Sequence, residues 1–423
     1  MIQGDNPSNG QHEFDSPEFM SAIRDNSTVS SVIDTLKRRR ENVLRGGVNC
    51  IPLPFERFRS ELPGIEQEQY VIVTANEKVG KTSFADFLYV FHVLDYCYRN
   101  PDKCSCHIIY FSLEETVEKV ITRYMSYLLY KLDGIRIAPT DLRSTNSDYP
   151  VPQEVLDKLE SEEYKKRLDF FDANVQFETE DTNPTGILRV CKDYAKTVGE
   201  YKSHRQMSNG ANFKEIEVFD SYKPYDPNHY KIVILDHIGL VDKEQGFRTK
   251  DSIDKMSEYG VKYLRNRFKY TFVAIQQQAA EAQGLEAVKQ KRTVPTTSTL
   301  ADSKYTSRDG DIVIGEFDPS RFGLPAWLGY KIQDADGTGL RSYGRFIYIL
   351  ANRNGEMGGI CPLFFDGAVC HFEELPKPDD INAITPYYTK AQSIKSFKQT
   401  RKKAMLSLIL FIRRLIGYDR KNI

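Results

Sequence analysis

The stretch YVIVTANEKVGKTSFADFL, residues 70–88, decides the fold of this chain. Its first six residues, Tyr70–Ala75, are mostly apolar or β-branched and predict a buried strand. The turn Ala75–Thr82 follows, and after it apolar residues recur at the spacing of one helix face, at Phe84, Phe87, Leu88 and Phe91. A strand, a turn ending in glycine-lysine-threonine and a helix in direct succession predict a phosphate-binding P-loop. Ala75 departs from the motif, which usually begins with glycine.

The residues of this P-loop have distinct chemical roles. Gly80 has no Cβ, so backbone N–H groups can turn inward around a phosphate. The helix that begins there directs its positive end toward the same anion. Lys81 is predicted to reach the β- and γ-phosphates of ATP, and the Thr82 hydroxyl is predicted to bind Mg²⁺. The predicted nucleotide-binding residues are Ala75, Asn76, Glu77, Lys78, Val79, Gly80, Lys81, Thr82 and Ser83.

Length and charge limit the classes of function. At 423 residues the chain has room for one large domain with extensions or for two domains. It carries 58 basic and 59 acidic residues, so no global field attracts it to nucleic acid or to a membrane, and any such contact needs a local patch. The first residues lack the apolar segment of a signal peptide, and no run approaches the ~20 apolar residues that a membrane span needs.

Seven cysteines without the spacing of a disulfide framework indicate reduced thiols in a cytosol-like compartment. The group Cys97, Cys104, Cys106 and His107 leaves a metal site open as an alternative, although its spacing matches no common zinc pattern.

A second motif predicts the partner of the P-loop. The stretch Lys231–Asp236, KIVILD, has four consecutive apolar residues before an aspartate, which is typical of a parallel strand covered on both faces. With a P-loop upstream, this pattern predicts a Walker B strand. Asp236 is then predicted to hold Mg²⁺, directly or through water, together with Thr82.

Two further polar residues end predicted core strands. Glu114 follows the strand His107–Leu113, where a carboxylate can orient a water toward the γ-phosphate; a charge that favours a helix N-terminus is the open alternative. Gln277 ends the strand after Walker B, where an amide can sense the γ-phosphate and pass the change to the loop that follows.

Two basic segments are candidates for contact with nucleic acid. The loop 279–300 carries Lys289, Lys291 and Arg292, which suit phosphate-backbone contact, and a solvated loop is the alternative. Residues 28–44 predict an amphipathic helix whose run Lys37–Arg40 is interpreted as a solvated face, with direct DNA contact as the alternative. Such a helix is marginal alone, so we expect it to dock on another surface.

Strands and helices alternate along the chain around the P-loop, with the chemistry at strand C-termini. This order predicts an α/β fold of three layers with a mostly parallel central sheet. Residues 199–229 are polar and tyrosine-rich without a clear period, and we interpret them as a long surface insertion. Further helices are predicted over 141–143, 156–168, 184–198 and 252–268. Further strands are predicted over 174–177, 271–275, 311–317, 346–350 and 368–374.

From Gly46 to Leu375 the chain resembles the motor domain of DnaB-type replicative DNA helicases, a branch of the RecA-like P-loop NTPases. The resemblance consists of motifs in the family's order, namely the P-loop with alanine first, Phe111–Glu114 (FSLE) with Arg123 after it, Ile234–His237 (ILDH), Ala274–Gln277 (AIQQ), Leu300–Ser303 (LADS), Asp309–Asp311 (DGD) and Arg353–Gly355 (RNG). His237 stands where tyrosine is more usual.

The resemblance implies a function. It implies an ATP hydrolase with Mg²⁺ as cofactor, acting as a ring, with a hexamer expected, that translocates on single-stranded DNA and unwinds forked duplex. Glu114 is implied as catalytic base, Gln277 as sensor, and Arg353 as an arginine that acts on a neighbouring subunit's nucleotide. The family's lysine near that arginine is replaced by Ala351.

The resemblance also implies how the chain is divided. We expect a disordered N-terminus over 1–27, a linker helix over 28–45, a RecA-like ATPase/helicase domain over 46–375 and a basic tail over 376–423. The family's collar domain is missing ahead of the linker helix, so the resemblance implies a protein of phage type in which that helix contacts the adjacent subunit. It also implies a cytoplasmic protein of bacteria or of a phage-infected host. The tail predicts a basic amphipathic helix that docks on the ring or on a replication partner such as a primase, polymerase or loader; a membrane surface is the alternative.

Two other functional classes stay open from the sequence. A RecA-like recombinase or recombination mediator would share the P-loop and Walker B strand. An ATP-dependent loader or scaffold with weak turnover would be consistent with the missing lysine at Ala351.

Overall fold

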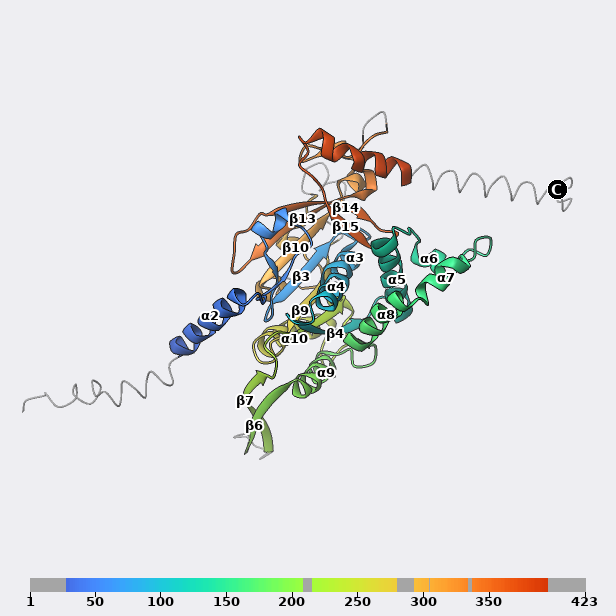
Figure 1. Ribbon diagram of the computed structural model, residues 1–423. Helices are drawn as coiled ribbons and strands as arrows, with labels where there is room; N and C mark the ends of the chain where they lie inside the picture. Colours follow the sequence, from blue (N-terminus) through green and yellow to red (C-terminus); the bar gives the residue numbers. More distant parts are fainter. Residues whose placement is uncertain (1–27, 208–214, 280–292, 304, 334–336, 395–423) are drawn as a thin grey trace, which may run out of the picture. The chain divides into compact units, whose positions relative to one another are not determined.

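The computed structural model describes residues 28–207, 215–279, 293–303, 305–333 and 337–394 (Figure 1). They belong to two compact units, residues 1–50 and 51–423. The predicted disordered segment 1–27 and the tail from residue 395 onward, with its predicted amphipathic helix, lie outside the described residues.

The described residues of the first unit, 28–50, include the helix α2 (Thr28–Leu44), at the bounds expected from the sequence. The helix ends where Gly46 adopts a positive φ of 82°, and Asn42 Nδ2 donates to the Val48 carbonyl at 2.9 Å. Large apolar side chains are exposed along it, namely Val29, Val32, Ile33, Leu36, Val43 and Leu44.

The second unit is built on a nine-stranded sheet with the order β15-β14-β13-β10-β3-β9-β8-β4-β5. From β10 to β5 all neighbouring strands are parallel, whereas β13, β14 and β15 extend the sheet as antiparallel strands. The strands are β3 (Tyr70–Ala75), β4 (Ser105–Ser112), β5 (Val175–Glu178), β8 (His229–Asp236), β9 (Thr271–Gln277), β10 (Ile312–Phe317), β13 (Gly344–Asn352), β14 (Ile360–Asp366) and β15 (His371–Glu374).

Helices cover both faces of this sheet, because successive side chains of each buried strand point to opposite faces. Val71 and Val73 face one hydrophobic cluster, with Phe84 and Phe91 of the P-loop helix, while Tyr70 and Ile72 face the other. The first cluster is covered by α3 (Lys81–Ala85), a π-helical turn (Asp86–Phe91), α4 (His92–Arg99), α5 (Val117–Asp133), α7 (Gln153–Leu159) and α8 (Glu162–Asn174). The second is covered by α9 (Pro184–Thr197) and α10 (Thr249–Tyr259), which continues as a π-helical turn (Gly260–Arg265).

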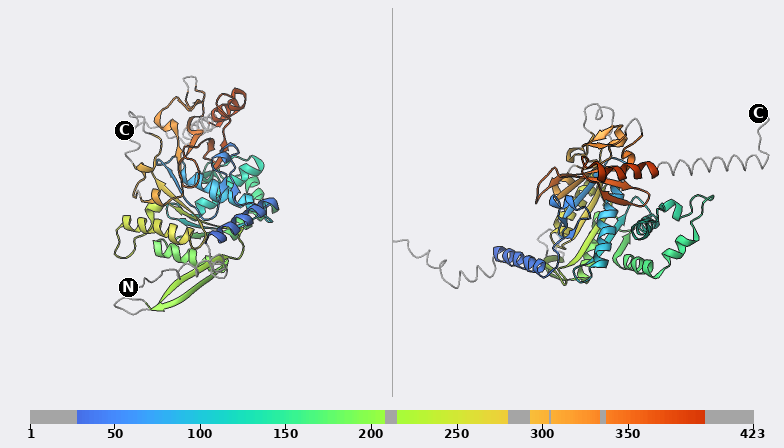
Figure 2. Two further views of the ribbon diagram at one scale, coloured as in Figure 1. Left: turned by 90° about the vertical axis from the view of Figure 1, so that its left-hand side faces the viewer. Right: turned by 45° about the horizontal axis from the view of Figure 1, so that its top comes forward.

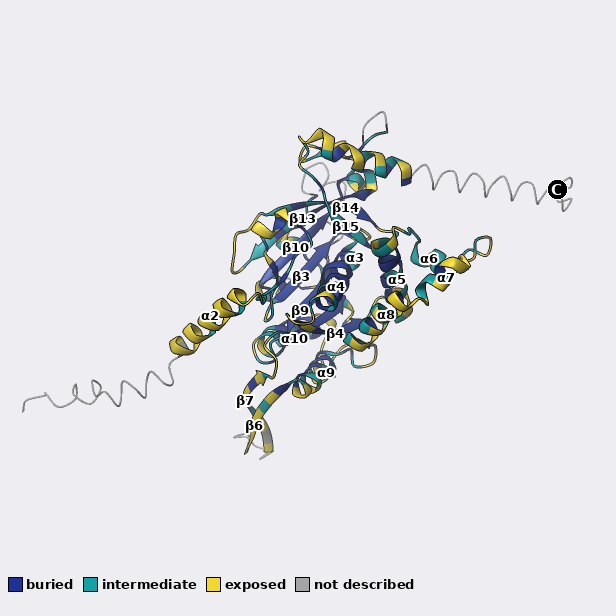
Figure 3. Ribbon diagram, in the orientation of Figure 1, coloured by how far each residue is buried: buried dark blue, intermediate teal, exposed yellow. Residues whose placement is uncertain are grey.

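The predicted three-layer α/β architecture is therefore confirmed, and Figure 3 shows the buried sheet between helices whose outer sides are exposed. A third hydrophobic cluster covers the antiparallel end of the sheet and includes Phe346 and Phe364, with Ile384 and Ala391 from helical residues 381–394. In the part of the chain that the structure describes, no helix is long and apolar enough to cross a membrane.

Several parts of the structure differ from the sequence-based prediction. Residues 381–394 form a helix that was not predicted, and the predicted helix over 156–168 is divided between α7 and α8. Residues 199–229, for which no element was predicted, contain a hairpin of β6 (Gly199–Met207) and β7 (Glu215–Pro224) that extends from the sheet in Figure 2. Most side chains of this hairpin are exposed, so its strands lack the alternation of apolar and polar residues by which a half-buried strand is predicted. β14 was not predicted, and the last strand begins at His371 rather than Ala368.

The cysteine group does not form a metal centre in the described part of the chain, where no cluster of three or more His, Cys, Asp or Glu side chains is arranged to hold an ion. Cys97 and Cys104 are both buried, with their Sγ atoms 3.5 Å apart.

Lys231 in β8 is a buried cation inside the core. Its side chain is 0% exposed, its Nζ lies 5.1 Å from the centre of the Tyr222 ring and 5.7 Å from that of Tyr270, and no hydrogen bond partner reaches it. Burial is the main cause that lowers the pKa of Lys231 to about 8. The folded state thus binds this proton less tightly than the unfolded state does.

We expect Lys231→Met to raise the free energy of unfolding at pH 7 by about 1–3 kcal/mol, because methionine fills similar volume without a buried charge and the tyrosine rings offset only part of the cost. The burial penalty is fully present below pH 8 and is relieved as pH rises from 8 toward 10.5, the ordinary lysine value. Urea denaturation at pH 7 and pH 10 measures this. If the difference in free energy of unfolding between wild type and variant is as large at pH 10 as at pH 7, burial of the Lys231 charge is not its cause.

Candidate nucleotide-binding site

The predicted P-loop, Walker B and sensor residues meet at one edge of the sheet. β3, β4, β8 and β9 are parallel, so their carboxyl ends lie together, with Ala75 paired in register with Gln277 and Ser112 with Asp236. In open α/β sheets ligands bind at this edge. The sheet topology therefore brings together residues that are far apart in the sequence.

The loop between β3 and α3 has the backbone shape that a phosphate cradle needs. Lys78 and Gly80 have positive φ values of 59° and 133°. A Cβ at Gly80 would lie 3.0 Å from Glu316 Oε1 and 3.2 Å from Phe365 Cε1, so only glycine fits there. Helix α3 begins directly after it, where the Phe84 N–H donates to the Gly80 carbonyl at 2.8 Å.

The nine predicted nucleotide-binding residues differ in exposure. Ala75, Asn76, Val79 and Lys81 are buried, Gly80, Thr82 and Ser83 are half-buried, and Glu77 and Lys78 are exposed. Asn76 Oδ1 is buried without a hydrogen bond partner, which leaves an unsatisfied polar atom inside the loop.

Thr82 and Asp236 lie side by side beneath the P-loop. The Thr82 hydroxyl donates to Asp236 Oδ1 at 3.2 Å. Burial first, and then the charge of Asp86, raise the pKa of Asp236 to about 7, so this corner holds more buried negative charge than its cations balance. Two oxygen donors beside excess negative charge fit a hard divalent cation such as Mg²⁺.

Glu114 lies on the open side of the same site. It follows the end of β4, is exposed, and its Oε2 is 3.7 Å from Lys81 Nζ, which is itself 8% exposed. The neighbouring Glu115 has a different environment, because Arg123 of α5 binds both Glu115 and the buried Asp86 of the P-loop helix. Arg123 thereby ties the turn that carries Glu114 to the helix that follows the P-loop.

The three glutamines at the end of β9 divide into two kinds. Gln277 is half-buried beside the P-loop strand, whereas Gln276 and Gln278 are buried. Gln276 Nε2 donates to the carbonyls of Ala301 at 2.5 Å and Ser303 at 3.0 Å. Gln278 Nε2 donates to Thr74 Oγ1 at 2.9 Å, which ties β9 to the P-loop strand.

These two buried glutamines were missed as functional candidates, although their alternation with Gln277 along a strand was a usable signal. Through hydrogen bonds to the carbonyls of Ala301 and Thr296, they hold the segment that follows the loop after β9. The predicted DNA-contacting residues Lys289, Lys291 and Arg292 of that loop lie outside the described residues.

Arg353 lies at the opposite edge of the sheet. It follows β13, which runs antiparallel to β10, so Asn352 pairs with Ile312 at the amino end of β10. Its Nη1 is 3.6 Å from Asp311 Oδ1, and Nη2 donates to the Arg308 carbonyl at 2.8 Å. The P-loop follows the carboxyl end of β3, whereas Arg353 lies at the edge where β3 begins. The two edges are one strand length apart, roughly 17 Å at 3.3 Å per residue. The structure does not bring Arg353 to the P-loop of its own chain.

A cavity of about 560 Å³ adjoins the P-loop, and sequence reasoning missed it. It contacts the loop through Arg345, whose Nε donates to the Val79 carbonyl at 2.8 Å, and through Phe365, which faces Gly80. Its size suits a base and ribose. No sequence motif predicts this cavity, because its lining comes from separate segments of the chain. The lining residues are Arg136, Ala138, Thr140, Asp141, Ser342, Tyr343, Arg345, Phe365, Asp366, Gly367 and Ala368.

Comparison with known proteins places the fold. No family model matches the sequence, and no curated protein matches it either. Among solved structures, one described as an ATPase domain is similar at a TM-score of 0.58 with 14% identity, covering 83% of this chain and 100% of that one. A DnaB-like replicative helicase, described with its interactions with primase, is similar at a TM-score of 0.56 with 14% identity, covering 84% of this chain and 69% of that one.

The second unit therefore has the RecA-like fold of DnaB-type helicase motor domains, as the sequence motifs led us to expect.

Proposed function

We propose that this protein is an ATP-dependent DNA helicase motor that forms a ring, translocates on single-stranded DNA and unwinds duplex. The observation that carries the proposal is the convergence of Lys81, Thr82, Glu114 and Asp236 at one edge of the sheet. These four residues supply the parts that phosphoryl transfer from ATP requires, in a fold shared with DnaB-type helicases.

ATP would bind with its phosphates over the P-loop and its base in the adjoining cavity. The backbone N–H groups around Gly80 and the positive end of α3 would hold the phosphates, and Lys81 would neutralise the charge that develops on them. Thr82 and Asp236 would hold Mg²⁺, which when bound would supply positive charge to stabilise the phosphates. Glu114 would orient the attacking water and accept its proton, from a position that is open to solvent.

The catalytic arginine would come from a neighbouring subunit. Arg353 lies about one strand length from its own P-loop, so it can act on a nucleotide only across a subunit interface, and a closed ring gives every site such a neighbour. The exposed apolar residues of α2 would supply a further contact to the adjacent subunit, since a helix with such a face is marginal alone.

Hydrolysis would be transmitted to DNA through the loop after Gln277. The chain is tied at the end of β9 by Gln276 and Gln278, so a change at Gln277 would be passed to the loop that carries Lys289, Lys291 and Arg292. A channel lined by such loops can be positive although the chain as a whole is nearly neutral. A primase is one candidate partner, because the similar DnaB-like helicase was described with one.

One experiment tests the proposal against its alternatives. The purified full chain, supplied with ATP and Mg²⁺, is assayed on a forked duplex and imaged by electron microscopy. We expect strand separation that depends on ATP, and closed rings. Filaments on DNA with strand pairing would indicate a recombinase instead, and slow turnover without unwinding would indicate a loader or scaffold.

A further inference from the structure

A buried ion cluster lies directly behind the P-loop and is not explained by the site described above. Glu316 of β10 pairs in register with Ala75, at the point where β3 becomes the P-loop, and is 0% exposed. Arg345 of β13 is 6% exposed at its side chain, with Nε 3.3 Å from Glu316 Oε1 and Nη1 3.0 Å from Asp318 Oδ2. Charged groups this deeply buried are costly, because the loss of solvation can exceed the gain from pairing them.

Glu316 occupies a place that the sheet would otherwise fill with an apolar residue. On the same face of β10, Ile312 and Ile314 belong to the hydrophobic core. Both carboxylate oxygens of Glu316 lack a hydrogen bond, and Arg345 is the cation beside them. Burial is the main cause that raises the pKa of Glu316 to about 7. An apolar residue at this position would be less costly, so stability alone does not account for the pair.

Arg345 acts on the backbone of the P-loop. Its Nε donates to the Val79 carbonyl at 2.8 Å, and Nη1 donates to the carbonyls of Ser342 and Gly344, each at 2.9 Å. Across a planar trans peptide bond, the carbonyl and the N–H point in opposite directions. Because Arg345 draws the Val79 carbonyl toward the sheet, the N–H of Gly80 is turned outward, to the side where a phosphate would lie.

We propose that Arg345 is a positioning residue for nucleotide phosphate, which fixes the Val79–Gly80 peptide with its N–H toward the ligand, and that Glu316 holds Arg345 in place. The inference rests on the proposed nucleotide-binding function and adds a residue to it. Arg345 also lines the cavity next to the P-loop and lies over the Phe365 ring, 5.1 Å from its centre. An occupant of that cavity would therefore contact the same guanidinium that sets the phosphate loop.

The test compares ADP binding by calorimetry for the full chain and its variants. Arg345→Ala is expected to weaken ADP binding about tenfold to a hundredfold, the effect of losing a charge-assisted hydrogen bond. Arg345→Lys keeps one donor for the Val79 carbonyl but loses the guanidinium that also contacts Glu316 and Asp318. Its ADP affinity is therefore expected to lie between those of wild type and Arg345→Ala. Glu316→Gln is expected to weaken binding less than Arg345→Ala does.

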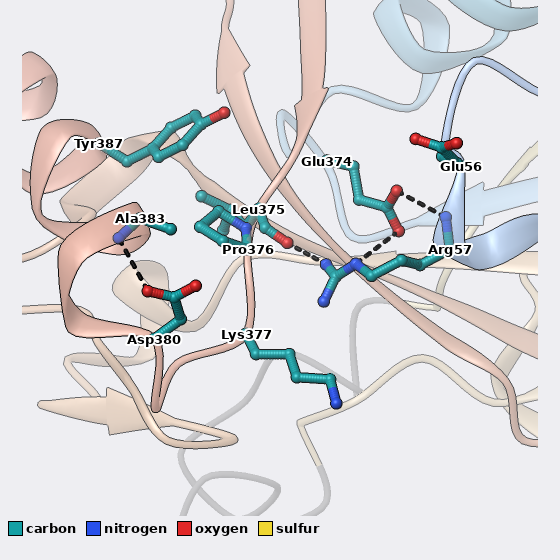
Figure 4. A pocket seen from close by; sticks show the side chains of 9 residues that line it. All are labelled: Glu56, Arg57, Glu374, Leu375, Pro376, Lys377, Asp380, Ala383 and Tyr387. Carbon is teal, nitrogen blue, oxygen red and sulfur yellow. Dashed lines mark hydrogen bonds and ion pairs between the residues drawn. The ribbon is translucent and has the colours of Figure 1, made fainter.

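Arg57 provides a control with similar chemistry away from the P-loop. It lies in another pocket, where its backbone N–H donates to Glu374 Oε2 at 2.9 Å, its Nε is 3.5 Å from Glu374 Oε1 and its Nη2 donates to the Leu375 carbonyl (Figure 4). Arg57→Ala is expected to lower the melting temperature without changing ADP affinity. If Arg345→Ala and Arg345→Lys bind ADP within twofold of wild type, the inference is wrong. If wild type itself binds no ADP, the proposed function fails instead.

Discussion

Replacing Lys81 with alanine is expected to abolish ATP hydrolysis and duplex unwinding. Lys81 is buried at the start of α3, and its ammonium lies 3.7 Å from Oε2 of Glu114, the proposed catalytic base. Removing the cation leaves the phosphate charge that develops in the transition state without its nearest partner. We expect turnover to fall at least a hundredfold, as when one preorganised donor to a developing anion is removed. A phosphate-release assay and a forked-duplex assay measure the two activities.

A matched control for this substitution is Lys231→Met. Lys231 is also a buried lysine in a core element, but it lies at the start of β8 among tyrosine rings, away from the carboxyl ends of the strands. This variant is expected to keep its hydrolysis rate while gaining stability. Full unwinding by Lys81→Ala, in protein with a wild-type melting temperature, would rule out the P-loop as the motor site.

Arg353→Ala is expected to lower ATP hydrolysis by about 10³- to 10⁵-fold, the range known for arginines supplied to phosphoryl transfer by another chain or domain. The sharper expectation concerns mixtures. In a ring made of Arg353→Ala and Lys81→Ala subunits, some interfaces pair an intact P-loop with an intact arginine from the neighbour. Those interfaces should hydrolyse ATP, so the mixture should exceed both parent variants.

Arg265 supplies the control for this experiment, because it shares the partner of Arg353. Its Nη1 lies 2.5 Å from Asp311 Oδ1, and its side chain is only 13% exposed, against 48% for Arg353. Arg265→Ala is expected to reduce stability and leave hydrolysis in place. If mixed rings form, as co-purification of two tags would show, and no activity returns, then Arg353 does not act between subunits.

The sequence determined the elements that carry the phosphate chemistry. β3 was predicted at its observed bounds, and β4 and β8 within two residues of theirs, with the P-loop helix directly after the turn. Buried strands and amphipathic helices leave a regular apolar pattern in the chain. The grouping of Lys81, Thr82, Glu114 and Asp236 could also be predicted, since parallel strands end at one edge of a sheet and each residue lies at such an end or after it.

What the sequence did not reveal depends on neighbours that are distant along the chain. The hairpin β6–β7 has mostly exposed side chains, so no apolar period marks its strands. Gln276 and Gln278 are buried because segments more than twenty residues later fold back on β9. Arg345 meets Val79 across 266 positions, and only the pairing of β10 with both β3 and β13 brings them together.

The sequence by itself thus determined the P-loop at Ala75–Thr82, the strands beside it and the residues at their ends, because these are recorded in local patterns. The tertiary structure alone decided which way the antiparallel strand β13 runs. That direction places Arg353 at the edge away from its own P-loop and Arg345 directly behind that loop. The physical reason is that strand direction and order are set by long-range hydrogen bonding and burial, which leave no periodic trace in either strand.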